Sequence, residues 1–364
     1  MIVKDITDHL EAIAPLHHQE SYDNSGLLVG SNMSAITGIL ITLDVTEAVI
    51  DEAIEHGINL IVAHHPLIFS GIKKLNSKHW VDRCIVKAIK NDICIYAIHT
   101  NLDNVINGVN MKICERLGLI NTRILSPKHN TLLKLVTFIP KADKEKVQNA
   151  LFEAGAGVIG NYSECSFEME GRGNFKPNGD ANPTIGKLNT REIVEEVRLE
   201  VMLPTDRQHA VIGALKLAHP YEKVAYYLSN LENQNQEIGA GMIGELSSPV
   251  PTKDFLKSLK SLMSTHCVRH TSVEKKMVSK IAVCGGSGSF LLKAAIQQQA
   301  DIFITGDFKY HEFFEADNKI VIADIGHYES EQFTKDLLYD ILSKKFANIA
   351  LRLSEVETNP IKYL

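Results

Sequence analysis

The chain has 364 residues, of which 45% are hydrophobic, and a formal net charge of −6. This length allows about two domains with substantial cores. Charges of both signs are mixed along the chain without a basic block, which argues against strong nucleic-acid binding. The charged stretch 1–10 and the lack of a long apolar run argue against a signal segment and a membrane partner, so we expect a cytoplasmic protein.

Strand-like and helix-like segments alternate at both ends of the chain. In the N-terminal part, apolar runs alternate with amphipathic stretches at 39–43, 46–56, 58–63, 79–91, 93–98 and 108–117. The same order returns near the C-terminus at 281–284, 289–299, 301–304, 309–316, 319–323 and 328–344. Such alternation predicts an α/β fold in which two similar βα halves each form a largely parallel sheet covered by helices.

The middle of the chain contains an internal repeat. Residues 134–140 (Lys-Leu-Val-Thr-Phe-Ile-Pro) are matched, 64 positions later, by 198–204 (Arg-Leu-Glu-Val-Met-Leu-Pro). Each copy reads strand, proline, helix, strand, which is the duplicated unit of a ferredoxin-like βαββαβ domain. We therefore predict a discontinuous outer domain, 1–127 and 237–364, interrupted by an inserted α+β domain at 128–236.

Two adjacent histidines mark the first candidate site. His64 and His65 follow the apolar run 58–63, and Pro66 comes directly after them. Neighbouring side chains of a strand point to opposite faces, so both imidazoles can converge on one site only where the strand has ended. Pro66 favours such an end because it lacks an N–H group. Two imidazoles side by side are better placed to hold two neighbouring ions than to chelate one.

Further candidate ligands follow other predicted strands. Asp103 lies just beyond the strand at 93–98, and His327 lies just beyond the strand at 319–323. Glu331 comes four residues after His327, so a helix beginning there would place both side chains on one face. Ligands gather at the carboxyl ends of parallel strands, and this set predicts a two-metal site of the hydrolytic type. His99 and His311 are weaker candidates for supporting residues, since a lone histidine near a strand end more often only packs.

Four other motifs contain glycine and could form turns or bind ligands. Residues 239–244 match G-x-G-x-x-G, but no strand precedes them, so we do not predict a bound nucleotide cofactor. Residues 285–289 either hold an anion with their amides or form a tight turn. Residues 171–177 read as a solvated hairpin, with an anion contact as the alternative, and 23–27 read as a turn.

Six motifs carry a resemblance to a known family: 23–27, 64–67, 99–103, 306–307, 310–311 and 326–331. Together they resemble the dinuclear metal-centre family called NGG-interacting factor three-like. Members of this family are often labelled homologues of GTP cyclohydrolase I type 2. The inserted domain is similar to the PII- and CutA-like domain of longer bacterial members. The resemblance implies that His64 and Asp103 hold one ion, that His65 and His327 hold the other, and that Glu331 bridges both. It also implies a homohexamer built as a trimer of dimers.

These expectations lead to one main functional hypothesis and two alternatives. The main hypothesis is a hydrolase that uses two divalent ions per subunit (zinc, iron or manganese) on a nucleotide-like or phosphorylated small molecule. Ring opening of GTP with release of formate is the named candidate reaction. The first alternative is a metal-binding regulatory or scaffold protein that senses a small effector through its inserted domain, and the second is metal storage or delivery.

Overall fold

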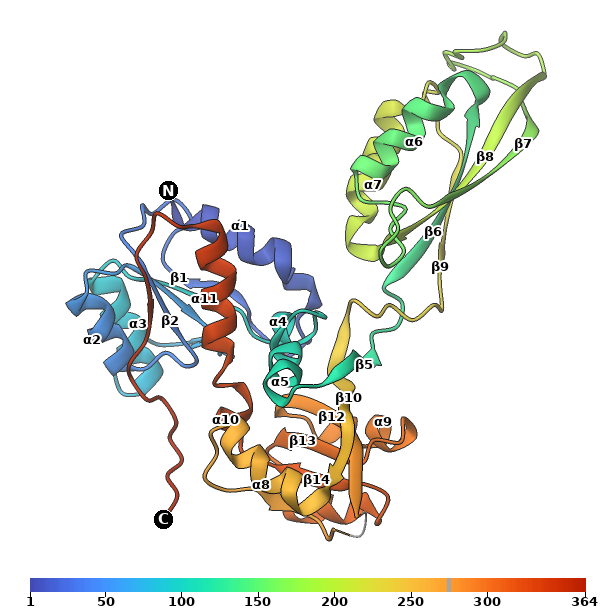
Figure 1. Ribbon diagram of the computed structural model, residues 1–364. Helices are drawn as coiled ribbons and strands as arrows, with labels where there is room; N and C mark the ends of the chain where they lie inside the picture. The colour runs from blue at the N-terminus through green and yellow to red at the C-terminus, as the bar shows by residue number, and fades with distance from the viewer. Residues whose placement is uncertain (274–275) are drawn as a thin grey trace. The chain divides into compact units, whose positions relative to one another are not determined.

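The computed structural model describes residues 1–273 and 276–364, and the chain divides into two compact units (Figure 1). The outer unit consists of Met1–Pro127 together with Gln236–Leu364, and the inserted unit consists of Lys128–Asn235. Both units combine helices with a β-sheet, so the predicted α/β class is confirmed.

The first sheet of the outer unit has five strands in the order β1-β4-β3-β2-β15. Their bounds are Gly26–Val29 (β1), Ile39–Thr42 (β2), Leu60–Ala63 (β3), Cys94–Ala97 (β4) and Leu351–Leu353 (β15). The strands from β4 to β15 pair in parallel, whereas β1 pairs antiparallel with β4. Every residue of β2, β3 and β4 is buried, which explains why these strands read as continuous apolar runs.

Helices alternate with these strands along the chain. They are α1 (Val3–Ile13), the 3₁₀ turn η1 (Leu16–His18), α2 (Glu47–Glu55), α3 (Trp80–Lys90), α4 (Thr100–Asp103) and α5 (Val109–Leu117). The Thr46 hydroxyl caps the start of α2 by accepting from the amide of Val49 at 3.3 Å. Gly118 ends α5 in the left-handed conformation.

The second sheet of the outer unit has the order β11-β14-β13-β12-β10-β5. Its strands are β5 (Ile120–Pro127), β10 (Gly239–Pro251), β11 (Arg269–His270), β12 (Met277–Ser287), β13 (Ile302–Gly306) and β14 (Val321–Asp324). The helical segments are α8 (Thr252–Leu262), η4 (Ser289–Leu291), α9 (Leu292–Gln297), η5 (Tyr310–Ala316), α10 (His327–Glu331) and α11 (Thr334–Lys345). One hydrophobic core joins both sheets, since it contains Val62 and Tyr96 together with Ile281 and Ile304.

The first outer sheet is largely parallel, as predicted, but the second is less parallel than predicted. Strands β5, β10 and β11 pair antiparallel with their neighbours. Strand β10 contains the glycine-rich segment 239–244 and two prolines, and the sequence did not predict it as a strand. Pro249 is tolerated because it lies where the pairing with β12 shifts register, between Glu245 and Val250.

The inserted unit follows the order β6-α6-β7-β8-α7-β9, with both helices on one face of an antiparallel sheet ordered β7-β8-β6-β9 (Figure 1). Its segments are β6 (Leu132–Pro140), η2 (Lys141–Asp143), α6 (Lys144–Glu153), β7 (Ser166–Phe175), β8 (Glu192–Pro204), η3 (Thr205–Arg207), α7 (Gln208–Ala218) and β9 (Tyr226–Asn230). The two copies of the repeat form the paired strands β6 and β8. Their helices bury matched residues, Val147 and Leu151 from α6 and Val211 and Leu215 from α7.

Residues 171–175 of the predicted solvated hairpin form one arm of the antiparallel pair β7–β8 and not its turn. Residues up to Phe175 belong to the edge strand β7, where Gly171 and Gly173 pair with Glu196 and Val194 of β8. An edge strand tolerates glycine, and a side chain on Gly173 would overlap the Glu196 carboxylate.

Within the described part of the chain, no helix combines the length and the apolar composition that crossing a bilayer requires.

Candidate metal centre

The predicted ligands meet where strands of the two outer sheets end. His64 and His65 directly follow β3, and their amides extend its parallel pairing by donating to the carbonyls of Thr42 and Leu43 at 3.2 and 2.9 Å. Asp103 closes α4, just after β4, and His327 opens α10, just after β14. The carboxyl-end rule thus places ligands from both halves at one site.

A first group of donor atoms consists of His64 Nε2, Asp103 Oδ1 and Glu331 Oε1. His64 Nε2 lies 3.7 Å from Asp103 Oδ1 and 3.8 Å from Glu331 Oε1. The His64 side chain is fully buried, and neither its Nε2 nor Asp103 Oδ1 has a hydrogen-bond partner among the described residues. A buried polar atom without a partner costs about 1–3 kcal/mol, so this group is built for a ligand.

A second group consists of His65 Nε2, His327 Nε2 and Glu331 Oε2. The carboxylate oxygen lies 2.9 Å from His65 Nε2 and 3.1 Å from His327 Nε2, and the two nitrogens are 3.3 Å apart. His327 and Glu331 share one face of α10, as their spacing predicted. The two oxygens of the buried Glu331 therefore face different groups of donors.

The backs of the imidazoles are held by oxygen atoms. His64 Nδ1 donates to the carbonyl of Ile98 at 2.9 Å, and a carbonyl can only accept, so the lone pair of His64 Nε2 faces the cluster. His65 Nδ1 pairs with Asp44 at 2.8 Å, and His327 Nδ1 pairs with Asp307 at 2.7 Å. Metal-ligating histidines in proteins are oriented in this way by an oxygen partner on the second ring nitrogen.

The spacing of the donors fits metal ions. Donor atoms that stand about 2.0–2.2 Å from a tetrahedral zinc ion lie roughly 3.3–3.6 Å from one another. The first group is slightly wider than this, at 3.7–3.8 Å, and the second is slightly narrower, at 2.9–3.3 Å. The residues present therefore form clusters that can bind metal.

The cluster perturbs the pKa values of its own members. Burial opposes a charged imidazole, but the carboxylates of Asp44 and Glu331 outweigh it and raise the pKa of His65 to about 9. Burial is likewise outweighed at His327, mainly by Glu331, and its pKa rises to about 11. Burial and the nearby charge of Glu331 raise the pKa of Asp103 to about 7. Cations are strongly favoured at this point of the chain.

Glycines allow the backbone to approach the cluster closely. Gly286 has a φ of +62°, and a side chain there would overlap Glu331 Oε1. A Cβ on Gly306 would lie 2.7 Å from the amide nitrogen of His327. These positions exclude every larger residue without a shift of the ligands.

The anion-binding alternative for residues 285–289 is wrong, because their amides are already used. The amides of Gly285, Gly286 and Gly288 donate to the side chains of Asn110, Ser330 and Thr305 at 2.9–3.0 Å.

Of the two weaker histidine candidates, His99 lies beside the cluster and His311 does not. The His99 ring lies 5.3 Å from the rings of both His64 and His65, and its Nδ1 pairs with Asp23 at 2.8 Å. Asp23 also accepts from the amide and hydroxyl of Thr100, so the predicted turn at 23–27 in fact anchors His99. His311 is exposed and packs against Tyr310 and Phe314, outside the cluster.

A family model described as Duf34/NIF3 (NGG1p interacting factor 3) matches residues 1–360. The chain belongs to this family. Relatives from Staphylococcus epidermidis and Bacillus subtilis, both named GTP cyclohydrolase 1 type 2 homolog, are 38% and 39% identical; the alignments cover 100% and 99% of this chain and 100% and 98% of the relatives. The crystal structure of a Bacillus cereus protein related to NIF3 matches with 37% identity and a TM-score of 0.85, over 100% of this chain and 99% of the other.

Sequence reasoning missed the supporting carboxylates of this DUF34/NIF3 chain. Asp44 follows β2 at the same edge of the sheet as His64, and that position was its only signal. Asp307 lies in the motif 306–307, to which the sequence assigns no role on its own. It follows β13 with a φ of 59°, an uncommon backbone conformation outside glycine that points to a local constraint.

A pocket of about 660 Å³ opens beside the cluster. Five aromatic side chains line it: Tyr22, Phe69, Trp80, Phe290 and Tyr328. Across the described ranges 1–273 and 276–364, the lining contains acidic groups and histidines but neither lysine nor arginine. The aromatic side chains suit a flat ring.

Proposed function

We propose that this chain is a metal-dependent hydrolase whose histidine–carboxylate cluster holds two divalent ions. The division of the two Glu331 oxygens between two donor groups is the observation that carries the proposal. His64 and Asp103 would serve one ion, and His65 and His327 the other. Zinc, iron and manganese all suit these donors. Such ions would supply Lewis acidity and would lower the pKa of a water bound at the site.

The chain's own residues would perform the remaining tasks. Asp44 and Asp307 fix the tautomers of His65 and His327, so each presents a lone pair to the site. The aromatic wall would bind and orient a planar substrate.

The names of the relatives suggest a substrate. They make hydrolytic ring opening of GTP, with release of formate, the first reaction to test for a nucleotide-like or phosphorylated small molecule. The aromatic lining of the pocket predicts that the base contributes to binding. We therefore expect guanosine to be a substrate as well as GTP.

The test measures formate release by protein loaded with zinc, iron or manganese under anaerobic conditions. GTP, GMP and guanosine are compared, and Glu331→Ala is expected to abolish the reaction. Glu329→Gln is the matched control, because Glu329 lies on α10 but contacts Asn359 instead of the cluster. Metal-replete protein that releases no formate from any of the three would refute the substrate assignment.

Assembly is a separate proposal. We infer from the family membership a homohexamer arranged as a trimer of dimers. Light scattering coupled to gel filtration tests it, and a monomeric or dimeric mass would contradict it.

A regulatory function is the second candidate, and one observation favours it. The inserted unit contains a pocket of about 770 Å³ built from its own residues. Hydrolysis at the metal cluster of the outer unit does not require this pocket, so the pocket favours an additional binding function.

A further inference from the structure

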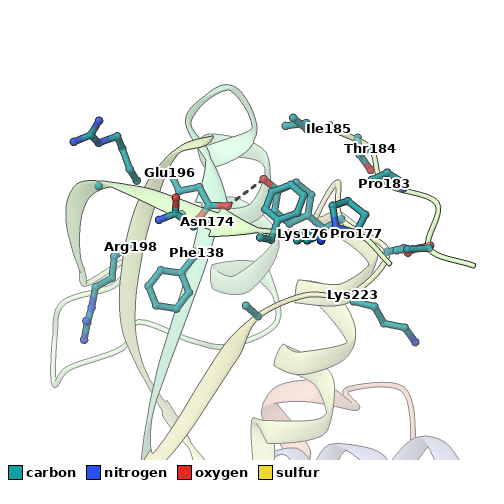
Figure 2. Close-up of a pocket in the computed structure, with 18 of the residues that line it drawn as sticks. Phe138, Asn174, Lys176, Pro177, Pro183, Thr184, Ile185, Glu196, Arg198 and Lys223 are labelled. Carbon is teal, nitrogen blue, oxygen red and sulfur yellow. Dashed lines mark hydrogen bonds between the residues drawn. The ribbon is translucent and has the colours of Figure 1, made fainter. Parts of the chain in front are cut away.

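The pocket of the inserted unit lies over the sheet near β6, β7 and β8 and is bordered by the segments 176–185 and 221–227 (Figure 2). Neighbouring residues of a strand point to opposite faces of the sheet. Helices α6 and α7 pack on one face, and the pocket lies on the other. Leu135 and Leu199, for example, belong to the core under the helices, whereas Phe138 and Arg198 line the pocket.

One part of the lining is aromatic and apolar. Phe138 comes from β6, Phe175 from the end of β7, and Tyr221 from the loop before β9. The rings of Phe175 and Tyr221 lie 5.8 Å apart, and Pro177 borders the same space (Figure 2). Such a lining favours a flat ring.

A second part of the lining is positively charged and unpaired. Lys176, Lys223 and Arg172 line the pocket, and among the residues that the structure describes they form no ion pair. By contrast, the lining residue Arg198 already pairs with Glu200 at 2.7 Å, and Glu170 pairs with Lys141. The free cations can therefore bind an anionic group.

Glu196 supplies a hydrogen-bond acceptor within the pocket. The hydroxyl of Tyr221 donates to Glu196 Oε1 at 3.0 Å, as the dashed line in Figure 2 shows. Gly173 lacks a side chain at the place where a Cβ would displace this carboxylate. A fixed carboxylate repels an anion but attracts an N–H or O–H group, so a ligand must carry a donor away from its anionic end.

We propose that this pocket is a binding site for a small organic anion that carries a flat ring and a hydrogen-bond donor. The anionic group would lie by Lys176 and Lys223, the ring against Phe138 and Tyr221, and the donor against Glu196. This site uses no residue of the metal cluster and stands whether or not the chain is a hydrolase.

The probe is 8-anilino-1-naphthalenesulfonate, which carries fused rings, an N–H group and one sulfonate. N-phenyl-1-naphthylamine has the same rings and N–H group without the charge, so it isolates the contribution of the anion. Both are titrated by fluorescence into the full-length chain with and without bound zinc. Hydrogen exchange with the sulfonate bound then locates the site through the amides of 171–185.

The charge variants are Lys176→Ala/Lys223→Ala and the control Lys146→Ala/Lys187→Ala. The control removes two exposed lysines of the same unit that do not line the pocket. We expect the first variant to raise the Kd of the sulfonate about tenfold and the control to change it less than about twofold. The Kd of the neutral probe should stay the same in both variants.

Gly173→Ala tests the carboxylate without removing a charge. Its added methyl group displaces Glu196, and we expect weaker binding of both probes, because both carry the N–H group. Equal sulfonate affinity in the two lysine variants would overturn the proposal. Tighter binding of the neutral probe, or no protection of 171–185, would overturn it as well.

Discussion

Replacement of Glu331 by glutamine separates a two-metal site from an ordinary buried ion-pair network. The substitution keeps the shape of the side chain and removes one negative charge. Glu331 Oε2 lies 2.9 Å from His65 Nε2 and 3.1 Å from His327 Nε2, whereas Oε1 lies 3.8 Å from His64 Nε2. The amide is neutral, so both donor groups lose the charge of this carboxylate, and its NH₂ group cannot accept, so one group also loses its acceptor atom.

The size of the effect follows from burial and charge. Removing one partner of a buried, hydrogen-bonded charge pair costs about 3–5 kcal/mol, and Glu331 is only 2% exposed. We expect metal-free Glu331→Gln to lose about this much unfolding free energy at neutral pH, where its two imidazoles carry protons. Metal affinity should fall more than about 100-fold, since even a residue that only supports a ligand is worth about 10–100-fold.

Metal content measured by elemental analysis after dialysis against a weak chelator distinguishes the roles. Wild type should retain about two ions per chain, and Asp103→Asn should retain about one, because Asp103 serves one group only. Glu331→Gln should retain neither ion. The control Glu329→Gln keeps an acceptor for Asn359 and should match wild type in metal content. A Glu331→Gln protein that still holds both ions would refute the bridging role.

Three further predictions concern the same unit. Asp44→Asn should weaken zinc binding about 10–100-fold, because Asp44 orients His65 without belonging to either donor group; unchanged affinity by competition with a chelator would contradict this. The raised pKa of His65 stabilises the metal-free protein fully below about pH 6.5, and this contribution is lost as the pH rises through about 9, so the Tm of chelated protein should fall over that window. The Tm of zinc-loaded protein should instead rise with pH, because zinc must displace the protons of the histidine ligands. Tm curves that run parallel with and without zinc would contradict this expectation. Trp80, the single tryptophan, is 47% exposed and lines the pocket beside the cluster, so guanosine should quench its fluorescence, and emission that guanosine leaves unchanged would contradict this.

Much of the candidate site was predictable because its signals are local. The histidine pair lies between an apolar run and Pro66, which predicts that both side chains follow the end of a strand. The spacing from His327 to Glu331 requires only one helical turn to place both on one face. The rule that ligands gather at the carboxyl ends of strands then brings together residues that are distant in sequence. The supporting residues were not predictable in this way. Asp44 and Asp307 look like ordinary loop aspartates until the fold places them behind the imidazoles.

The fold was predictable to a similar extent. Buried parallel strands are visible in the sequence as apolar runs, and the repeat of 134–140 at 198–204 corresponds to two strands that pair with each other. Strand β10 and the glycine-containing end of β7 were not predicted, because glycine and proline have low intrinsic preference for strands. Both rely on tertiary pairing: Gly171 and Gly173 are held by β8, and β10 is held between β12 and β5.

The place of the insertion explains how one chain can contain two separate compact units. Pro127 ends β5, Gly239 begins β10, and these two residues pair directly across an antiparallel ladder at the edge of the second sheet. The inserted unit therefore leaves and re-enters the outer unit at neighbouring points, and the ends of the gap are held together without it. A short glycine turn in place of 128–235 should close β5 and β10 into a hairpin and leave the metal content unchanged. Loss of both ions in that shortened chain, measured beside wild type, would show that the metal centre depends on the inserted unit after all.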